Sequence, residues 1–237
     1  MEALALDTDA AVAFLSELAG AGPVLELAVG TGRIALPLAE RGVDVHGIDA
    51  SEAMVERLRS KPGGERIRVT IGDFADVETE DRYTLVYVVF NTLFALQTQE
   101  AQIRCVRNVA ATLAADGVFV VDAFVPDLSR FERDQRVETE RVGLDHAWLG
   151  LARHYPVEQR VESQHLLLTE ERLRIYPVQI RYAYPSELDL MAQLAGLRLR
   201  DRFGGWRHEP FTAASAAHVS VYGHAEPRED LSAQAPS

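Results

Sequence analysis

VLELAVGTGR, residues 24–33, is the stretch that decides the fold. A short apolar run carries Glu26 and leads into a turn with glycines at positions 30 and 32, and apolar residues at helical spacing follow. A strand, a tight loop and a helix N-terminus in this order let the backbone approach a nucleotide-like ligand closely. The stretch therefore predicts the first strand and the ligand-binding loop of an α/β fold. It does not say which nucleotide-like ligand is bound.

The composition is that of one ordinary globular protein. A chain of 237 residues with 47% hydrophobic and 25% charged residues can bury a full core. We expect a single domain over residues 1–224, followed by a disordered tail over 225–237 that is rich in Pro, Ser and acidic residues. The formal net charge of −12 argues against nucleic acid as a partner, so a small-molecule partner is expected.

Two further features bear on localisation. No apolar run approaches the roughly 20 residues that would span a bilayer, so we expect no membrane partner. The opening residues lack the basic region of a secretory signal, and Cys105 is the single cysteine of the chain. These features favour a cytoplasmic protein with a structural, reduced thiol.

The pattern after residue 23 alternates between strands and helices. Strands are predicted at 24–27, 43–48, 67–71, 85–90 and 118–124. Helices are predicted between them at 32–41, from Ser51 onward and at 99–114, and one further helix, at 8–19, precedes the first strand. Such alternation predicts a doubly wound parallel sheet with right-handed crossovers.

The pattern changes after Phe131. Residues 132–184 alternate with little helical periodicity, which predicts an antiparallel β insertion on the substrate side. A helix from Pro185 to Leu194 and two strands at 197–203 and 218–222, paired as a hairpin, complete the predicted order.

Two classes of cofactor fit the glycine loop. Residues 30–35 match the dinucleotide fingerprint G-x-G-x-x-A, and Asp49 lies near the distance expected for a ribose-binding acid. On this interpretation the protein would be an NAD-dependent oxidoreductase. An anionic Glu26 would repel a pyrophosphate, however, and would favour a ligand that carries an ammonium and a sulfonium. S-adenosylmethionine is such a ligand.

With these residues in place, the sequence resembles the class I S-adenosylmethionine-dependent methyltransferases, particularly the small-molecule type common in bacteria. The resemblance rests on residues 26–33, 47–54, 72–74 and 90–93, in that order. It implies a seven-stranded Rossmann-like sheet of order 3-2-1-4-5-7-6 with the last strand antiparallel. It also implies S-adenosylmethionine as the cofactor and S-adenosylhomocysteine as the product.

The resemblance assigns cofactor-binding roles to residues that follow the first four strands. Asp49 would accept hydrogen bonds from the ribose hydroxyls, and Asp73 from the adenine amino group. Ala28 stands where the family usually has a glycine. The full set is Glu26, Ala28, Gly30, Gly32, Arg33, Asp49, Ala50, Met54, Asp73, Phe74, Phe90 and Asn91.

Methyl transfer from a sulfonium is an in-line displacement that depends mainly on alignment of the acceptor. A base is needed only where the acceptor must lose a proton. We take His154, Tyr182 and His208 as the catalytic candidates, and we expect no metal, because no ligand cluster follows the fourth strand. Oxygen, nitrogen and carbon acceptors all remain open.

The sequence leaves open two alternative functions and the oligomeric state of the protein. The alternatives are the NAD-dependent oxidoreductase and a cyclase or binding protein that keeps the cofactor without transferring its methyl group. The antiparallel insertion could also support a homodimer.

Overall fold

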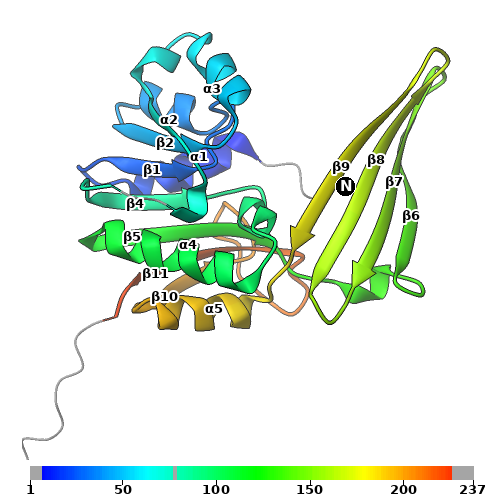
Figure 1. Ribbon diagram of the computed structural model, residues 1–237. Coiled ribbons are helices and arrows are strands. Elements are labelled where there is room, and N and C mark those ends of the chain that lie inside the picture. Colours follow the sequence, from blue (N-terminus) through cyan, green and yellow to red (C-terminus); the bar gives the residue numbers. More distant parts are fainter. Residues whose placement is uncertain (1–6, 77–78, 226–237) are drawn as a thin grey trace, which may run out of the picture.

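A seven-stranded sheet with helices on both faces forms the body of the protein (Figure 1). The computed structural model describes residues 7–76 and 79–225. The strands are β1 (Val24–Leu27), β2 (Val45–Asp49), β3 (Arg68–Ile71), β4 (Tyr83–Val88), β5 (Leu113–Phe124), β10 (Leu197–Phe203) and β11 (Ala217–His224). Their order is β3-β2-β1-β4-β5-β11-β10, and β11 runs antiparallel to both of its neighbours. The predicted order and the predicted C-terminal hairpin are confirmed.

The helices divide the core into two layers. Buried residues of α1 (Thr8–Leu18), α2 (Ala35–Glu40) and α3 (Glu52–Arg59) share one cluster with one face of the sheet. Those of α4 (Gln99–Thr112) and α5 (Pro185–Leu194) share another cluster with the opposite face. Short 3-10 helices lie at η2 (Gly64–Arg66), η3 (Phe74–Asp76), η4 (Thr92–Ala95) and η5 (Leu128–Arg130).

Several predicted boundaries are wrong. Away from the ligand-binding edge, β5 begins at Leu113 and not at 118, so the helix predicted to reach 114 ends at Thr112. Two others lie beside that edge. The helix expected from Gly32 begins at Ala35, because Gly32 has a φ of +77° and cannot lie in a right-handed helix. The strand expected to reach Phe90 ends at Val88, because Phe90 has a φ of +59°. In both cases the chain enters a left-handed conformation within two residues of the strand, at Ala28 after β1 and at Phe90 after β4.

A second sheet projects from the body, and we call it the arm (residues 135–181; Figure 1). Its strands are β6 (Gln135–Val142), β7 (His146–Tyr155), β8 (Arg160–Thr169) and β9 (Leu173–Arg181), paired antiparallel in that order. This confirms the predicted antiparallel insertion after the fifth strand.

The base of the arm is fastened to the body by buried polar contacts. Arg181, which is 5% exposed, donates to Gln102 Oε1 on α4 at 2.7 Å and to Glu187 Oε1 on α5 at 2.7 Å. Val161 and Ile180 pack with the core of the body. One end of the arm is therefore held rigidly against the helices beside the sheet.

Two further sequence predictions concern the C-terminal tail and membrane-spanning segments. Apart from Ala225, the tail predicted over 225–237 lies outside the described residues. Within the described ranges, no helix combines the length and the apolar character needed to cross a membrane.

Candidate functional site

The loops after β1, β2, β3 and β4 meet at one edge of the sheet. The Gly30 amide donates to Asp49 Oδ2 at 2.7 Å, which joins the first loop to the second. The Gly72 amide donates to the Asp49 carbonyl at 3.0 Å, and the Arg33 guanidinium lies 5.3 Å from the centre of the Phe90 ring. The predicted cofactor-binding residues therefore gather where ligands of open α/β sheets bind.

The two glycines of the first loop differ in their surroundings. A Cβ atom added at Gly30 would meet only the Ala28 carbonyl, at 4.0 Å, whereas one at Gly32 would lie 3.0 Å from Leu36 and 3.1 Å from Leu58. Gly30 therefore leaves open space for a ligand, and Gly32 lets the loop pack on α2 and α3. Ala28 adopts a φ of +55°, a conformation that costs a non-glycine residue about 1–2 kcal/mol.

Asp49 ties two loops together with both carboxylate oxygens. Its Oδ2 accepts from the Gly30 amide, and its Oδ1 accepts from the Ser51 amide at 2.8 Å. The cap of α3 is Ser51, whose side chain accepts from the Met54 amide. Because each carboxylate oxygen has two lone pairs, Asp49 can still accept from a ligand hydroxyl.

The residues after β2 and β3 leave polar and apolar groups exposed at the same edge. Asp73 is exposed, and its Oδ1 accepts from the Ala75 amide at 2.8 Å. Met54 is 42% exposed and is therefore not a core methionine. Ala50 is exposed, and Phe74 is partly buried against the core. The placement of these residues is compatible with contacts to an adenosine moiety.

Glu26 lies beneath the loop rather than on its surface. It is 3% exposed, and its Oε2 accepts from the Tyr87 hydroxyl at 3.0 Å. Burial raises the pKa of its carboxyl to about 8, although hydrogen bonds from Tyr87 and from the Ala35 amide act in the opposite direction. The carboxyl is therefore mostly protonated at pH 7. The side chain is desolvated between β1, β4 and α2, which disfavours the anionic form that the sequence argument assumed. The contact of Glu26 with the cofactor stays a prediction.

The corner after β4 is clamped to β5. Phe90 and Asn91 both have left-handed backbones, with φ values of +59° and +61°. The Phe90 amide donates to Asp122 Oδ2 at 2.8 Å, and the Asn91 amide donates to the Asp122 carbonyl at 3.1 Å. Asn91 Oδ1 accepts in turn from the Phe124 amide at 2.6 Å. These bonds hold the exposed ring of Phe90 at the edge of the site.

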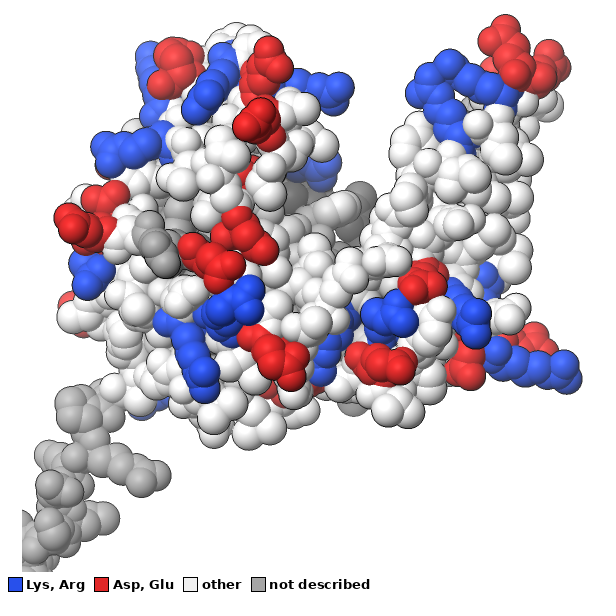
Figure 2. All heavy atoms as spheres, in the orientation of Figure 1, with Lys and Arg blue, Asp and Glu red and all other residues white. Residues whose placement is uncertain are grey.

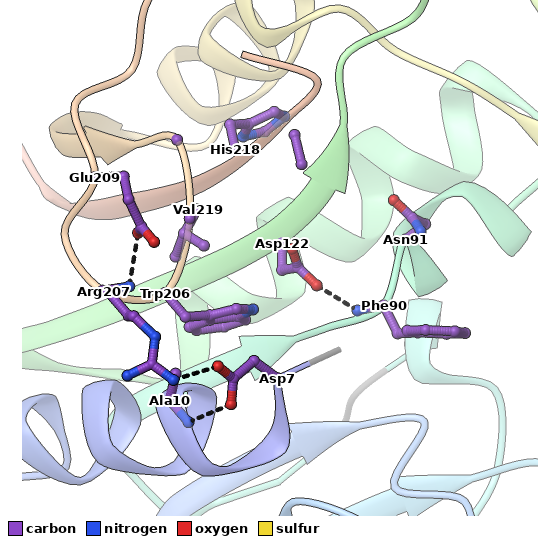
Figure 3. A pocket seen from close by; sticks show the side chains of 13 residues that line it. Asp7, Ala10, Phe90, Asn91, Asp122, Trp206, Arg207, Glu209, His218 and Val219 are labelled. Carbon is purple, nitrogen blue, oxygen red and sulfur yellow. Dashed lines mark hydrogen bonds and ion pairs between the residues drawn. The ribbon is translucent and has the colours of Figure 1, made fainter. Parts of the chain in front are cut away.

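A cavity of about 250 Å³ opens beside this corner (Figure 3). It lies between the start of α1, the corner after β4, the ends of β5 and β11, and the segment 204–209. Its lining consists of Asp7, Ala10, Phe90, Asn91, Asp122, Gly204, Gly205, Trp206, Arg207, Glu209, Ala217, His218 and Val219. Sequence reasoning missed Asp122. The sequence marks Asp122 only as a single acidic residue near the end of the apolar run VFVVDAF.

Three carboxylates line the cavity, and two of them serve Arg207. Asp7 accepts from the Arg207 guanidinium and from the Ala10 amide, and Glu209 Oε2 accepts from the Arg207 amide at 2.8 Å. Asp122 uses one oxygen for the Phe90 amide, and burial raises the pKa of its carboxyl to about 6. Among the described residues, none donates a hydrogen bond to its Oδ1.

The structure brings two of the three predicted catalytic residues together, His154 and Tyr182, and places His208 apart from them. His154 Nε2 lies 2.8 Å from the Tyr182 hydroxyl, and His154 is 4% exposed and stacked on Phe131 at the base of the arm. His208 stands in the chain between Arg207 and Glu209, which line the cavity, and its side chain is half exposed beside Phe14. None of the three lines the cavity. Their catalytic role stays a prediction.

A seven-stranded sheet of this order, with its ligand loops at the ends of β1 to β4, is the fold of the class I S-adenosylmethionine-dependent methyltransferases. A sequence profile described as "Methyltransferase domain" matches residues 24–117. The cypemycin N-terminal methyltransferase of a Streptomyces species is 31% identical over 199 residues, which cover 84% of this chain and 81% of that protein. The chain therefore belongs to the methyltransferase family.

Solved structures agree with this assignment. The CcbJ methyltransferase from Streptomyces caelestis is 40% identical, with a TM-score of 0.89 over 94% of this chain and 91% of that one. A S-adenosylmethionine-dependent methyltransferase from Clostridium acetobutylicum shares the fold at 11% identity, with a TM-score of 0.82 over 95% of both chains. These similarities decide against the NAD-dependent alternative and in favour of methyl transfer.

S-adenosylmethionine is the cofactor, and it supplies a methyl group on a positively charged sulfur. The residues present fit it, because Gly30 leaves an open cradle and Asp49 stands beside that cradle with free lone pairs. The contact assigned to each cofactor-binding residue stays a prediction.

Proposed function

We propose that this protein transfers the methyl group of S-adenosylmethionine to the nitrogen of an amine carried by a small molecule. The observation that carries the proposal is the cavity beside Phe90, whose lining combines three carboxylates with Trp206. The similarity to an N-terminal methyltransferase supports it, since that relative is named for methylation of an amine.

The charges in the cavity suit a cationic guest. Asp7 is balanced by the Arg207 guanidinium, whereas Glu209 accepts only from the Arg207 backbone amide. Among the described residues, Asp122 and Glu209 are therefore the carboxylates of the cavity without a cationic partner. Trp206 and Phe90 line the same space, and the faces of aromatic rings attract ammonium groups. A hydroxyl can also donate to a carboxylate, but a neutral acceptor carries no positive charge for the carboxylates and aromatic rings to stabilise. Nucleic acid is disfavoured as an acceptor by the net charge of −12.

A panel of acceptors tests the proposal. We expect labelled methyl to pass from S-adenosylmethionine to primary or secondary amines, and not to matched alcohols, phenols or carbon acids of the same size. Mass spectrometry of the products would locate the methyl group. Transfer to oxygen or carbon alone would refute the proposal. Binding of S-adenosylmethionine without transfer to any acceptor would favour the non-methylating alternative.

We further propose that residues 1–224 form a single domain, in which residues 132–184 lie on the side of the acceptor.

We also propose that two copies of the protein pair through the arm. One face of the arm carries an apolar stripe across all four strands, with Val137 opposite Leu151, and Leu149, Leu166 and Ile175 in adjacent register. Val137 is 74% exposed and Ile175 is 52% exposed. In Figure 2 the visible middle of the arm is free of charged side chains, which gather at its tip and base. An uncovered apolar sheet face of this kind suits a second copy.

The mass in solution tests the pairing. We expect light scattering to give twice the 26.2 kDa of one chain, and Ile175→Glu to halve that mass. Leu194→Glu, at an apolar residue of the body that is 60% exposed, is the matched control and should leave it unchanged. A monomeric wild-type protein would refute the pairing.

A cytoplasmic location is likewise a proposal, and fractionation of the native cells tests it.

A further inference from the structure

The side chain of Asp122 lies at the junction of the cofactor edge and the cavity. One of its oxygens accepts from the amide of Phe90, the corner residue beside the predicted cofactor loops. In Figure 3, Asp122 lies between the side chains of Trp206 and Phe90, within the same cavity lining. A group that contacts both the corner and the cavity is well placed to meet the atom that receives the methyl group.

The bonding of Asp122 leaves one oxygen for a ligand. Oδ2 is fixed by the Phe90 amide, and Oδ1 has no hydrogen-bond donor among the residues that the structure describes. The other two carboxylates of the cavity are bound to Arg207, one through its guanidinium and one through its backbone amide. Asp7 and Glu209 are exposed, so Asp122 is the partly buried carboxylate of the cavity whose orientation is fixed and whose second oxygen is unclaimed.

We infer that Asp122 is a catalytic residue, whose Oδ1 binds the acceptor ammonium in the cavity and accepts the proton that leaves its nitrogen. This inference rests on the proposed amine acceptor. The nitrogen lone pair then forms the new bond to the methyl carbon, the bond from that carbon to sulfur breaks, and its electron pair stays on sulfur. The proton resides on Asp122 and passes to water when the product leaves.

The ionisation of Asp122 is consistent with this role. Its pKa is raised to about 6 by burial, so the carboxylate is ionised at pH 7 and yet more basic than an ordinary aspartate. Protonation below about pH 6 removes both the counter-charge and the proton acceptor. The wild-type kcat/KM for an amine should therefore fall as the pH drops through this value.

Asp122→Asn is the variant that isolates the charge. The asparagine oxygen can still accept from the Phe90 amide, so the corner and the cofactor site should keep their shape. With an amine identified from the panel, we expect kcat at pH 7.5 to fall by about a hundred- to ten-thousand-fold. We also expect the acid limb of the pH profile to disappear. The affinity for S-adenosylhomocysteine should stay within about two-fold of the wild type.

Asp116→Asn is the matched control, because Asp116 is an exposed aspartate at the opposite end of the same strand. It should leave kcat, the pH profile and S-adenosylhomocysteine binding unchanged.

Three results would overturn the inference while leaving the proposed function intact. A kcat for Asp122→Asn within about three-fold of the wild type would show that the carboxylate is dispensable. A parallel loss of kcat and of S-adenosylhomocysteine affinity would show that Asp122 acts through the Phe90 corner. A wild-type profile without an acid limb near pH 6 would contradict the role even if the variant failed to fold. A wild-type enzyme that methylates no amine would instead refute the proposed function, and the inference with it.

Discussion

Glu26→Gln should make the protein progressively more stable than the wild type as the pH rises from about 5 to 8. The native Glu26 carboxyl has a pKa of about 8 because it is buried, whereas its ordinary value is 4.5. Between these two values the native state binds more protons than the unfolded state, so the wild type loses stability as the pH rises. The slope approaches about 1.4 kcal/mol per pH unit. Above pH 8 the carboxyl is ionised in both states and the difference levels off.

Urea unfolding at pH 5, 6, 7 and 8 would measure this effect. The glutamine amide is neutral and keeps an oxygen that can accept from the Tyr87 hydroxyl. Comparing the variant with the wild type at each pH cancels the contributions of all other titrating groups. Glu40→Gln, at an exposed glutamate of α2, is the control and should track the wild type. Stability curves for Glu26→Gln and the wild type that stay parallel would show that Glu26 is ionised in the native protein.

The same variant tests how Glu26 acts on the cofactor. If the carboxyl is protonated at pH 7, its replacement by an amide should leave S-adenosylmethionine affinity nearly unchanged. A drop of ten-fold or more would mean that an anionic Glu26 senses the cofactor, as the sequence argument assumed. Calorimetry at pH 7 separates these outcomes.

The sequence predicts those features of the site that follow from local pattern. Apolar runs closed by Gly30 and Asp49 locate the ends of β1 and β2, and in a parallel sheet those ends must meet at one edge. The alternation over 132–184 likewise predicts the arm, because antiparallel pairing needs only short turns between strands.

The features that escaped prediction depend on contacts between distant residues. The raised pKa of the Glu26 carboxyl follows from its burial in the core, where its hydrogen-bond partner Tyr87 lies 61 positions later in the chain. The left-handed corner at Phe90 is fixed by Asp122, from another strand, 32 positions away. Neither contact has a local signal, so a residue type alone could not give the charge of Glu26 or the role of Asp122.

Asp49→Ala should weaken S-adenosylmethionine binding by about 1–3 kcal/mol, which is roughly a 5- to 150-fold rise in Kd. The loss has two physical sources. The Gly30 and Ser51 amides lose their charged acceptor, so the first loop is no longer tied to β2. The predicted hydrogen bonds from the ribose hydroxyls are lost as well. Asp127→Ala removes a similar pair of bonds, to Ser129, at an exposed turn after β5, and should leave Kd unchanged.

An analogue of S-adenosylhomocysteine that lacks the ribose 2′-hydroxyl separates the two sources of this loss. If Asp49 binds that hydroxyl, the wild type should bind the analogue more weakly than S-adenosylhomocysteine, and Asp49→Ala should bind the two equally. This pattern is a coupling between one side chain and one ligand atom, which a loosened loop does not produce. An equal penalty for the analogue in both proteins would mean that Asp49 acts only by shaping the loop around Gly30. Its carboxylate would then resemble that of Asp122 in fixing a left-handed corner, but without an oxygen used by the ligand.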